Sequence, residues 1–174
     1  MAIRSTDART DAIRSGDHIF SFNATEQKLK YFLSSGMMQW AVAARGKGST
    51  DGYGTNGDTP PGLYKLSEPA WISERDREAN GLGRWFIPML PAISNTYVEN
   101  MRSNLGIHGG GTDLPNPLAS RQGWETTLGC IRVQNEDLSR VAYAVQRALQ
   151  SGSTAWLHVG WEVFVDGKKI VKMY

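Results

Sequence analysis

The sequence contains a single cysteine, only three histidines and no long hydrophobic run. One cysteine excludes a disulfide within the chain, so Cys130 is either a small buried apolar side chain or a functional thiol. The histidines are far apart, and neither a His-x-x-x-His nor a Cys-x-x-Cys pattern is present, which argues against a metal site. We therefore expect the protein to use no metal and no cofactor.

The chain also has little excess charge and no membrane segment. Its net charge is +2, and no run of lysine and arginine is interleaved with aromatic residues, which excludes nucleic acid as a partner. No apolar stretch is long enough for a membrane span, and the polar residues 1–17 contain no signal-peptide core. We expect either a chain without a leader or a periplasmic enzyme whose leader has been removed.

Most of the chain consists of short apolar runs separated by glycine, serine and asparagine. The alternation over residues 18–44 predicts β-hairpins, and residues 155–173 show the same pattern. The sequence Pro60-Pro61-Gly62 predicts a fixed turn before another strand. Residues 67–84 are expected to form a loop-rich middle, and two prolines interrupt the apolar segment 85–93 that follows.

Only one helix is strongly predicted. Apolar residues recur at helical spacing from Leu138 to Leu149. Asn135 is a potential N-cap, Asp137 favours the first turn, and Ser151-Gly152 ends the helix. Together with the strand pattern, this predicts a mainly β (α+β) domain with one or two helices packed against it.

Three residues near this helix have the chemistry of a nucleophilic site. His108 precedes a glycine run, Cys130 follows a glycine, and Arg132 comes two residues later. A thiol needs a base or a positive potential to become a nucleophile, and the histidine and the arginine can supply these. Backbone N–H groups near the cysteine can stabilise an oxyanion. Lone cysteines are more often inert and lone histidines more often structural, so spacing alone leaves both interpretations open.

Three segments carry a resemblance to a known family, in this order along the chain: His108-Gly109, Thr127-Leu128-Gly129-Cys130-Ile131-Arg132 and Asn135-Glu136-Asp137. They resemble the motif of the L,D-transpeptidase catalytic domain (YkuD type), and Thr59-Pro60-Pro61-Gly62-Leu63-Tyr64 resembles a turn that this family places before its site. The resemblance covers about residues 18 to 173. It implies an L,D-transpeptidase-like β-sandwich of mixed sheets over residues 18–174, after an N-terminal lead-in of residues 1–17.

The resemblance also implies a cysteine acyltransferase that acts on the tetrapeptide stems of peptidoglycan. Cys130 would attack the carbonyl of the third stem residue with loss of terminal D-Ala, with His108 as base and Gly129 at the oxyanion hole. An amine would then resolve the thioester, giving a 3-3 crosslink or a D-amino acid exchange, or water would, giving an L,D-carboxypeptidase. The Gly109 carbonyl would orient the imidazole. The residues expected at the substrate are Arg132, Thr127, Gly109, Trp124 and Arg121.

Two departures from the family pattern and two alternatives qualify this assignment. Many members carry histidine where this chain has Leu128, which makes His108 the only nearby base, and the loop from His108 to Cys130 is slightly long. A papain-like or NlpC-type peptidase is disfavoured because it places its cysteine before its histidine. The non-enzymatic alternative is a peptidoglycan-binding module that retains the fold without turnover.

The implied substrate places the site of action in the periplasm or cell wall, although no leader is visible. One hypothesis is an L,D-carboxypeptidase toxin delivered to rival bacteria, with a secretion apparatus or an immunity protein as partner. The plainer alternatives are a trimmed periplasmic enzyme and a misplaced start codon. Carbapenem-type inhibitors are expected to acylate Cys130.

Overall fold

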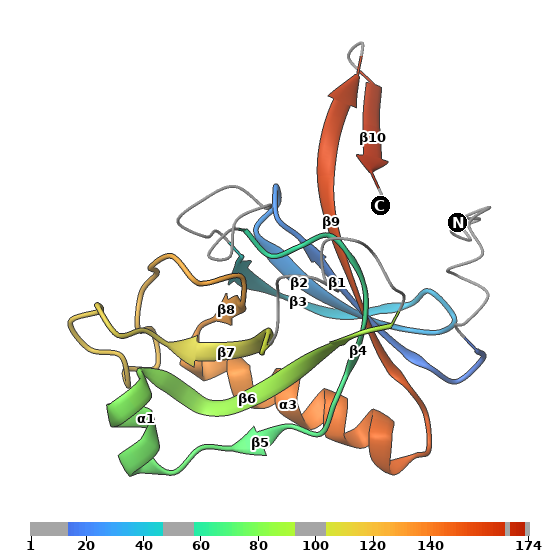
Figure 1. Ribbon diagram of the computed structural model, residues 1–174. Coiled ribbons are helices and arrows are strands. Elements are labelled where there is room, and N and C mark those ends of the chain that lie inside the picture. Colours follow the sequence, from blue (N-terminus) through green and yellow to red (C-terminus); the bar gives the residue numbers. More distant parts are fainter. Residues whose placement is uncertain (1–13, 47–57, 93–103, 166–167, 173–174) are drawn as a thin grey trace.

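The computed structural model describes residues 14–46, 58–92, 104–165 and 168–172, with side chains described as far as residue 160. Figure 1 shows helix α3 (Asn135–Gln150) along one side of the strands, while the end of β9 (Ala155–Val165) and β10 (Lys168–Lys172) extend away from the body. The other elements are β1 (His18–Asn23), β2 (Lys28–Leu33), β3 (Met38–Arg45), β4 (Gly62–Leu66), β5 (Ala70–Trp71), α1 (Glu74–Asn80), β6 (Leu82–Pro91), β7 (Gly106–Gly110) and β8 (Ile131–Val133).

The strands form one mixed sheet in the order β1-β2-β3-β8-β7-β6-β4-β9-β10, with the short strand β5 paired to β6. β1 also pairs with β9, so the path from β1 to β9 closes on itself. The β1–β9 and β7–β8 pairs are parallel and the others are antiparallel. The predicted mainly β domain with mixed strand pairing and one or two packed helices is confirmed.

The core lies between α3 and the apolar face of the sheet. The first three strands form the predicted hairpins, and their alternation buries one set of side chains: Phe20, Phe22, Leu29, Tyr31, Val42 and Ala44. The helix contributes a second set at helical spacing: Leu138, Val141, Ala142, Ala144, Val145 and Ala148. Burying one large apolar side chain contributes roughly 1.5–3 kcal/mol, so this core anchors the β7–β8 pair beside it.

The middle of the chain differs from the expectation of a loop. Helix α1 begins after Ser73, whose hydroxyl accepts a hydrogen bond from the Asp76 N–H over 3.2 Å, and ends at Gly81 with a φ of 60°. A helix of 7 residues is too short to show apolar periodicity, which explains why the sequence pattern missed it. β6 also continues through Pro88, whose carbonyl accepts from the Ser67 N–H over 3.0 Å.

Helix α3 begins at its predicted cap residue, so its N-cap lies one residue earlier than predicted. Gln134 occupies the N-cap position and makes no side-chain capping bond, whereas Asn135 is the first helical residue. The end at Ser151 and Gly152 agrees with the prediction, and Gly152 has a φ of 76°. Neither α1 nor α3, the helices of the described part of the chain, has the length and apolar character that crossing a membrane requires.

Of the predicted N-terminal lead-in, only residues 14–17 are described. Asp17 ties the start of β1 to β9, because its carboxylate accepts from the Thr154 N–H over 3.0 Å and from Trp156 Nε1 over 2.8 Å. Burial opposes the carboxylate charge, but these hydrogen bonds and one from the Arg14 N–H hold the pKa of Asp17 below its ordinary value. The last residue of the lead-in therefore packs with the domain.

Candidate active site

The parallel pair β7–β8 places the predicted base, His108, on one face of the sheet with Arg132. Ile107 is paired with Ile131, and His108 with Arg132. Paired residues share a face and side chains alternate along a strand, so His108 and Arg132 lie on the face opposite the two isoleucines. Cys130 lies immediately before β8, two residues before Arg132.

The opposite face of these strands packs against α3. The two paired isoleucines, Ile107 and Ile131, are fully buried. A Cβ added to Gly109, two residues after Ile107, would meet the side chains of Asn135 and Leu138 at the start of the helix. The helix therefore supports the strands from behind and leaves the other face to the chemistry.

The imidazole of His108 is held in one tautomer. Its Nδ1 lies 2.7 Å from the carbonyl oxygen of Gly109, and a carbonyl can only accept, so Nδ1 carries the proton. The lone pair of the neutral ring is then on Nε2, the atom that can act as a base. The contact predicted between the Gly109 carbonyl and the imidazole is present. Phe86, paired with His108 on β6, stacks on the ring with a centroid distance of 6.2 Å.

His108 is neutral at physiological pH. Only 6% of the residue is exposed, and burial lowers the pKa of His108 to about 4. The Gly109 carbonyl raises that pKa and the positive charge of Arg132 lowers it further. A neutral imidazole can accept a proton, and the imidazolium that results is a strong acid that gives the proton up readily.

Cys130 is half-buried at the end of the loop that enters β8. Its Sγ donates to the carbonyl of Asn104 over 3.9 Å, a contact that suits a protonated thiol. The thiol also interacts electrostatically with the guanidinium of Arg132, since a negative charge on Cys130 raises the pKa of that arginine. The same attraction favours the thiolate once the proton leaves.

The turn before Cys130 is fixed by one glycine and two threonines. Gly129 has a φ of 103°, a region that strains any residue with a side chain. Thr127, which is buried, donates its hydroxyl to the Cys130 carbonyl over 2.7 Å and accepts from the Gly129 N–H over 3.3 Å. The buried Thr59 donates to the same carbonyl over 3.4 Å. The upstream turn singled out in the sequence thus contacts the Cys130 segment.

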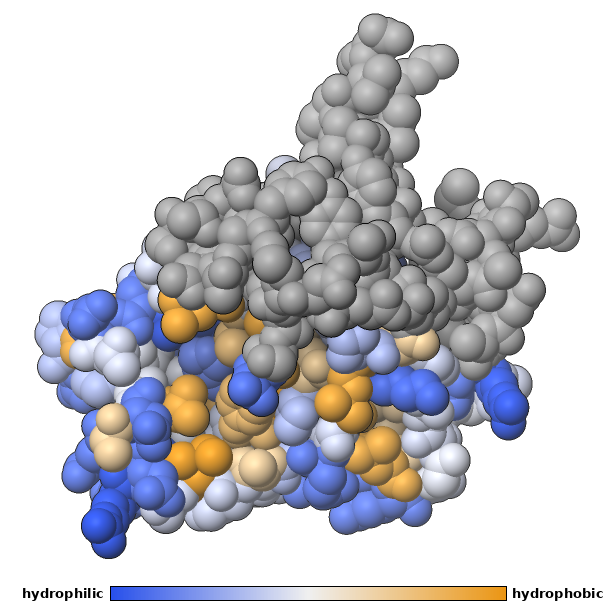
Figure 2. Space-filling view, in the orientation of Figure 1, coloured by the Kyte–Doolittle hydropathy of each residue, from blue (hydrophilic) through white to orange (hydrophobic). Residues whose placement is uncertain are grey.

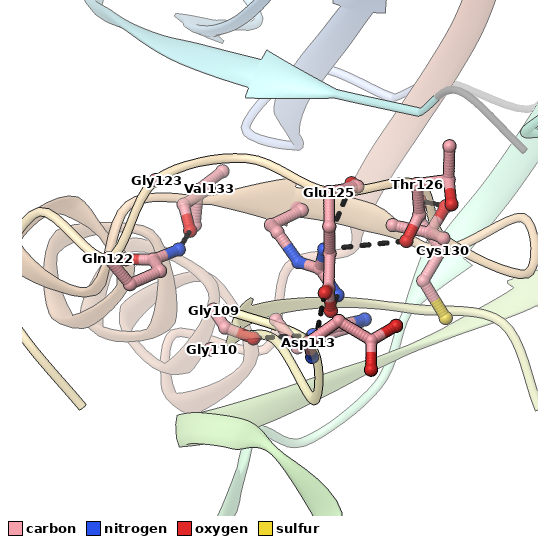
Figure 3. A network of polar contacts seen from close by, with 12 residues as sticks. Gly109, Gly110, Asp113, Gln122, Gly123, Glu125, Thr126, Cys130 and Val133 are labelled. Carbon is pink, nitrogen blue, oxygen red and sulfur yellow. Dashed lines mark hydrogen bonds and ion pairs between the residues drawn. The ribbon is translucent and has the colours of Figure 1, made fainter. Parts of the chain in front are cut away.

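Arg132 is buried and engaged with the chain itself. Its Nη2 lies 3.1 Å from Oε1 of Glu125, and its Nη1 donates to the Glu125 carbonyl over 2.9 Å. The other carboxylate oxygen of Glu125 accepts from the Asp113 N–H over 2.9 Å (Figure 3). Burial lowers the pKa of Arg132, and the charges of Glu125 and Cys130 raise it. Arg132 therefore joins the loop to the sheet beside the thiol, and its predicted contact with substrate stays a prediction.

Two buried glutamines hold the loop against β8 and α3. Gln122 donates to the Val133 carbonyl over 2.8 Å and accepts from the Asn135 N–H over 2.7 Å (Figure 3 shows the first of these bonds). Gln134 exchanges two hydrogen bonds with the backbone of Gly123, of 3.1 and 3.3 Å. Sequence reasoning missed both glutamines and Glu125, because glutamine and glutamate in a loop follow no spacing that marks them.

Asn135 links the two ends of the site. Its Oδ1 accepts from the Gly110 N–H over 3.1 Å, and its Nδ2 donates to the carbonyls of Pro117 and Ala119 over 2.8 and 2.7 Å. A Cβ on Gly109 would collide with this Asn135 amide, which explains why glycine must follow His108. The Asn135 side chain therefore binds the loop and strand β7 rather than capping the helix.

Trp124 and Arg121 each contact a charged side chain. The guanidinium carbon of Arg45 lies 4.4 Å from the Trp124 ring centroid, and Arg45 pairs with Arg132 across β3 and β8. Arg121 is exposed, and its Nε lies 2.6 Å from Oε1 of Glu136 in the first turn of α3. Of the residues predicted at the substrate, Thr127 is hydrogen-bonded to Cys130, Gly109 is hydrogen-bonded to the His108 ring, and Arg132 pairs with His108 across the strands. Trp124 contacts Arg45, and Arg121 contacts Glu136 at the start of α3.

The described part of the chain brings no three His, Cys, Asp or Glu side chains together as metal ligands. The side chains described around Cys130 offer a thiol, a neutral imidazole and a buried guanidinium.

A family model, the L,D-transpeptidase catalytic domain (YkuD), matches residues 17–169 of this chain. No curated protein has significant similarity to it. Among solved structures, the fold is similar to the helical cell shape determining protein Pgp2 from Campylobacter jejuni, with 20% identity and a TM-score of 0.58 over 90% of this chain and 50% of that one. It is also similar to Bd1075 from Bdellovibrio bacteriovorus, with 16% identity and a TM-score of 0.54 over 94% and 52% of the two chains.

A third similar structure is an L,D-transpeptidase from Stackebrandtia nassauensis, with 15% identity and a TM-score of 0.50 over 95% of this chain and 64% of that one. At such identities these likenesses establish the fold alone, and they agree with the fold predicted from the sequence. The chain spans about half the length of the first two relatives.

Proposed function

This chain belongs to the L,D-transpeptidase catalytic domain family, and we propose that it is a cysteine acyltransferase that acts on the tetrapeptide stems of peptidoglycan. The observation that supports this most strongly is the β7–β8 register, which pairs His108 with Arg132, the residue two positions after Cys130. The fixed tautomer of the imidazole is the second support, because it leaves Nε2 to take the proton.

Acylation begins with a neutral thiol and a neutral imidazole. Sγ of Cys130 attacks the carbonyl carbon of the third stem residue while its proton passes to Nε2 of His108. The carbon–sulfur bond forms, and the electron pair of the carbonyl moves onto oxygen. Since burial and Arg132 both disfavour the imidazolium, His108 passes the proton on to the nitrogen of terminal D-Ala, and the carbon–nitrogen bond breaks.

The second half of the reaction resolves the thioester. An incoming amine, or water, loses a proton to His108 as it attacks, and the proton then returns to the departing sulfur. An amine gives a 3-3 crosslink or a D-amino acid exchange, and water gives L,D-carboxypeptidase activity. The same two residues serve both outcomes, so the acceptor decides which one occurs.

We assign the oxyanion to the amides of Gly129 and Cys130. The Gly129 N–H donates to the Thr127 hydroxyl over 3.3 Å, a distance longer than the usual range for an N–H···O bond. An oxyanion is a stronger acceptor than a hydroxyl and can displace it. Arg132 is proposed to act on Cys130 through its charge and to orient the stem peptide, together with Thr127.

The test is mass spectrometry of muropeptides after incubation of tetrapeptide substrates with the protein, with and without a D-amino acid. Loss of terminal D-Ala, with exchange or crosslinking, supports the transferase, whereas tripeptides alone support the carboxypeptidase. The matched control is Cys130→Ala, which should fold and leave the substrates intact. Full turnover by that variant would refute the assignment, and binding without turnover by the wild type would favour a wall-binding module.

The proposed substrate places the reaction in the periplasm or cell wall. Delivery as a toxin to rival bacteria is a separate hypothesis, with a secretion apparatus and an immunity protein as its expected partners. It is tested by expressing the chain with and without a periplasmic leader. A toxin harms cells only when it reaches the periplasm, and growth unaffected by the exported protein would count against this hypothesis.

A further inference from the structure

Three aromatic side chains meet on the α3 side of the sheet, away from the catalytic face. Trp71 on β5 pairs with Trp85 on β6, and their ring centroids lie 5.0 Å apart at an interplanar angle of 86°. Tyr143 on α3 lies 6.0 Å from Trp85. Because Phe86 shares its face with His108, the neighbouring Trp85 belongs to the opposite face. We call Trp71, Trp85 and Tyr143 the aromatic platform.

The platform combines two exposed rings with one buried donor. Trp71 and Tyr143 are each 58% exposed, whereas Trp85 is 7% exposed. Nε1 of Trp85 is buried, and it has no acceptor among the residues that the structure describes. A buried donor without an acceptor costs about 1–3 kcal/mol, and buried tryptophan N–H groups usually have a partner. An acceptor from outside the described chain would satisfy this N–H, as it would Nε of Arg77 and Nε of Arg132, the other two such groups among the described residues.

Polar side chains of suitable chemistry border the exposed rings. The guanidinium of Arg84 lies 5.1 Å from the Trp71 ring centroid. Gln146, one helical turn after Tyr143, donates to the carboxylate of Glu68 over 3.4 Å, and both of these side chains are near the surface. Flat apolar rings bordered by a guanidinium, a carboxylate and an amide suit a ligand that has an apolar face and a rim of hydroxyl groups.

The size of the platform favours a small ligand over a protein. Two aromatic side chains exposed to this extent offer roughly 250 Å², whereas a stable protein interface buries about 800 Å² on each partner. Hydrophobic residues over β5 and β6 are interspersed with hydrophilic ones on the described part of the face in Figure 2. This surface is large enough for one or two sugar rings.

We propose that the aromatic platform binds a pyranose unit of a glycan. The apolar C–H face of the sugar packs on the exposed rings of Trp71 and Tyr143, and a hydroxyl or acetamido oxygen accepts from Nε1 of Trp85. That the glycan is the N-acetylated backbone of peptidoglycan rests on the proposed function. In that case the platform keeps the polymer on the protein and raises the local concentration of stem peptides at the catalytic face.

The test is a titration of the full chain with a β-1,4-linked N-acetylglucosamine tetramer. Binding is measured by tryptophan fluorescence and by isothermal titration calorimetry. We expect saturable binding, and Trp71→Ala should raise Kd about tenfold through the lost aromatic contact. Trp85→Phe keeps the ring and removes the donor, so it should also weaken binding. Met38→Ala, a change at an apolar residue that is 54% exposed on β3, is the matched control and should bind as the wild type does.

Thermal unfolding of each variant separates loss of binding from loss of folding. No saturable binding by the wild type, or unchanged binding by folded Trp71→Ala, would overturn the proposal. If the wild type binds no sugar but self-associates, and Trp71→Ala abolishes the self-association, the proposal is overturned. The platform is then an interface between copies of the chain. Cys130→Ala should bind the tetramer normally, so a failure of the proposed catalytic function would leave this outcome unchanged.

Discussion

The two faces of the β6–β7 region satisfy their buried polar groups in different ways. On the face of His108, the imidazole and both Nη atoms of Arg132 have partners within the chain, at Gly109 and Glu125, and Nε of Arg132 is the one nitrogen of these two side chains that is buried without an acceptor in the described chain. On the α3 face, the buried N–H of Trp85 has no acceptor in the described chain. We infer that the first face is preorganised for a reaction, whereas the second is completed by a ligand.

The largest difference between the two faces is expected when the proposed base, His108, is replaced by a residue that keeps its hydrogen bond to Gly109. Asparagine at position 108 places an amide near the position of Nδ1, so His108→Asn can still donate to the Gly109 carbonyl but has no Nε2. We expect turnover of tetrapeptide muropeptides to fall about 10²–10⁴-fold, the usual contribution of a general base. Binding of the sugar tetramer should not change. Near-normal turnover by this variant would show that the proton goes elsewhere.

The second largest effect is expected when the buried ion pair between Arg132 and Glu125 is broken. Glu125→Gln leaves the Arg132 charge buried without its counter-ion, and we expect the free energy of unfolding to fall by about 3–5 kcal/mol in chemical denaturation. The control is Glu136→Gln, which removes the exposed ion pair with Arg121. The N–O distance of that pair is 2.6 Å, shorter than the 3.1 Å between Arg132 and Glu125. Solvent screens that pair, so the control should show no measurable change. Equal losses in the two variants would contradict the role given to burial.

The low pKa of His108 predicts a pH dependence of stability. Its ordinary value is 6.5 and its value in the folded chain is about 4. Between these pH values the unfolded chain binds a proton that the folded chain does not, so the free energy of unfolding falls as the pH falls. The contribution of this residue is roughly 3 kcal/mol, present above pH 6.5 and lost by about pH 4.

Urea titrations of the wild type and His108→Asn across this pH window isolate that contribution. Burial also lowers the pKa of His158 and of His18, so these residues contribute to the pH dependence of both proteins. The contribution of His108 is therefore the difference between the slope of stability against pH in the wild type and the slope in His108→Asn. Identical slopes would show that His108 is not buried in its neutral form.

The smallest expected effect concerns the turn before the nucleophile. Gly129→Ala forces a side chain onto a φ of 103°, and Gly36→Ala does the same at a φ of 83° in the β2–β3 turn, where a Cβ meets nothing within 4 Å. Each should cost roughly 1–2 kcal/mol of stability. Only Gly129→Ala should also reduce turnover, because it moves Cys130. Equal turnover in Gly129→Ala and Gly36→Ala would show that the turn before Cys130 has no part in the mechanism.

The parts of this molecule that were predictable are those specified locally. Period-two alternation predicted β1, β2 and β3, and helical spacing predicted α3, because each pattern repeats over enough residues to be recognised. Cys130 and His108 stood out because the residues around them form a motif. The contact between His108 and the Gly109 carbonyl could also be predicted, since it joins neighbouring residues.

The parts that were missed depend on contacts between distant segments. Helix α1 is too short for a period, and Asn135 was interpreted as a cap because its partners, Gly110 and the loop near Pro117, are 18 to 25 residues away. Glu125 and the buried glutamines follow no pattern that separates them from a solvated loop. The aromatic platform joins β5, β6 and α3, and no sequence spacing brings these together.

The most direct test of the central claim is the intact mass of the protein after exposure to a carbapenem, with peptide mapping of the modified residue. If Cys130 is the nucleophile that His108 activates, its sulfur opens the β-lactam ring and the wild type gains the mass of one whole carbapenem on that residue. Cys130→Ala gains none, and His108→Asn gains it much more slowly. An adduct on Cys130→Ala, or equal acylation rates in the wild type and His108→Asn, would contradict the account.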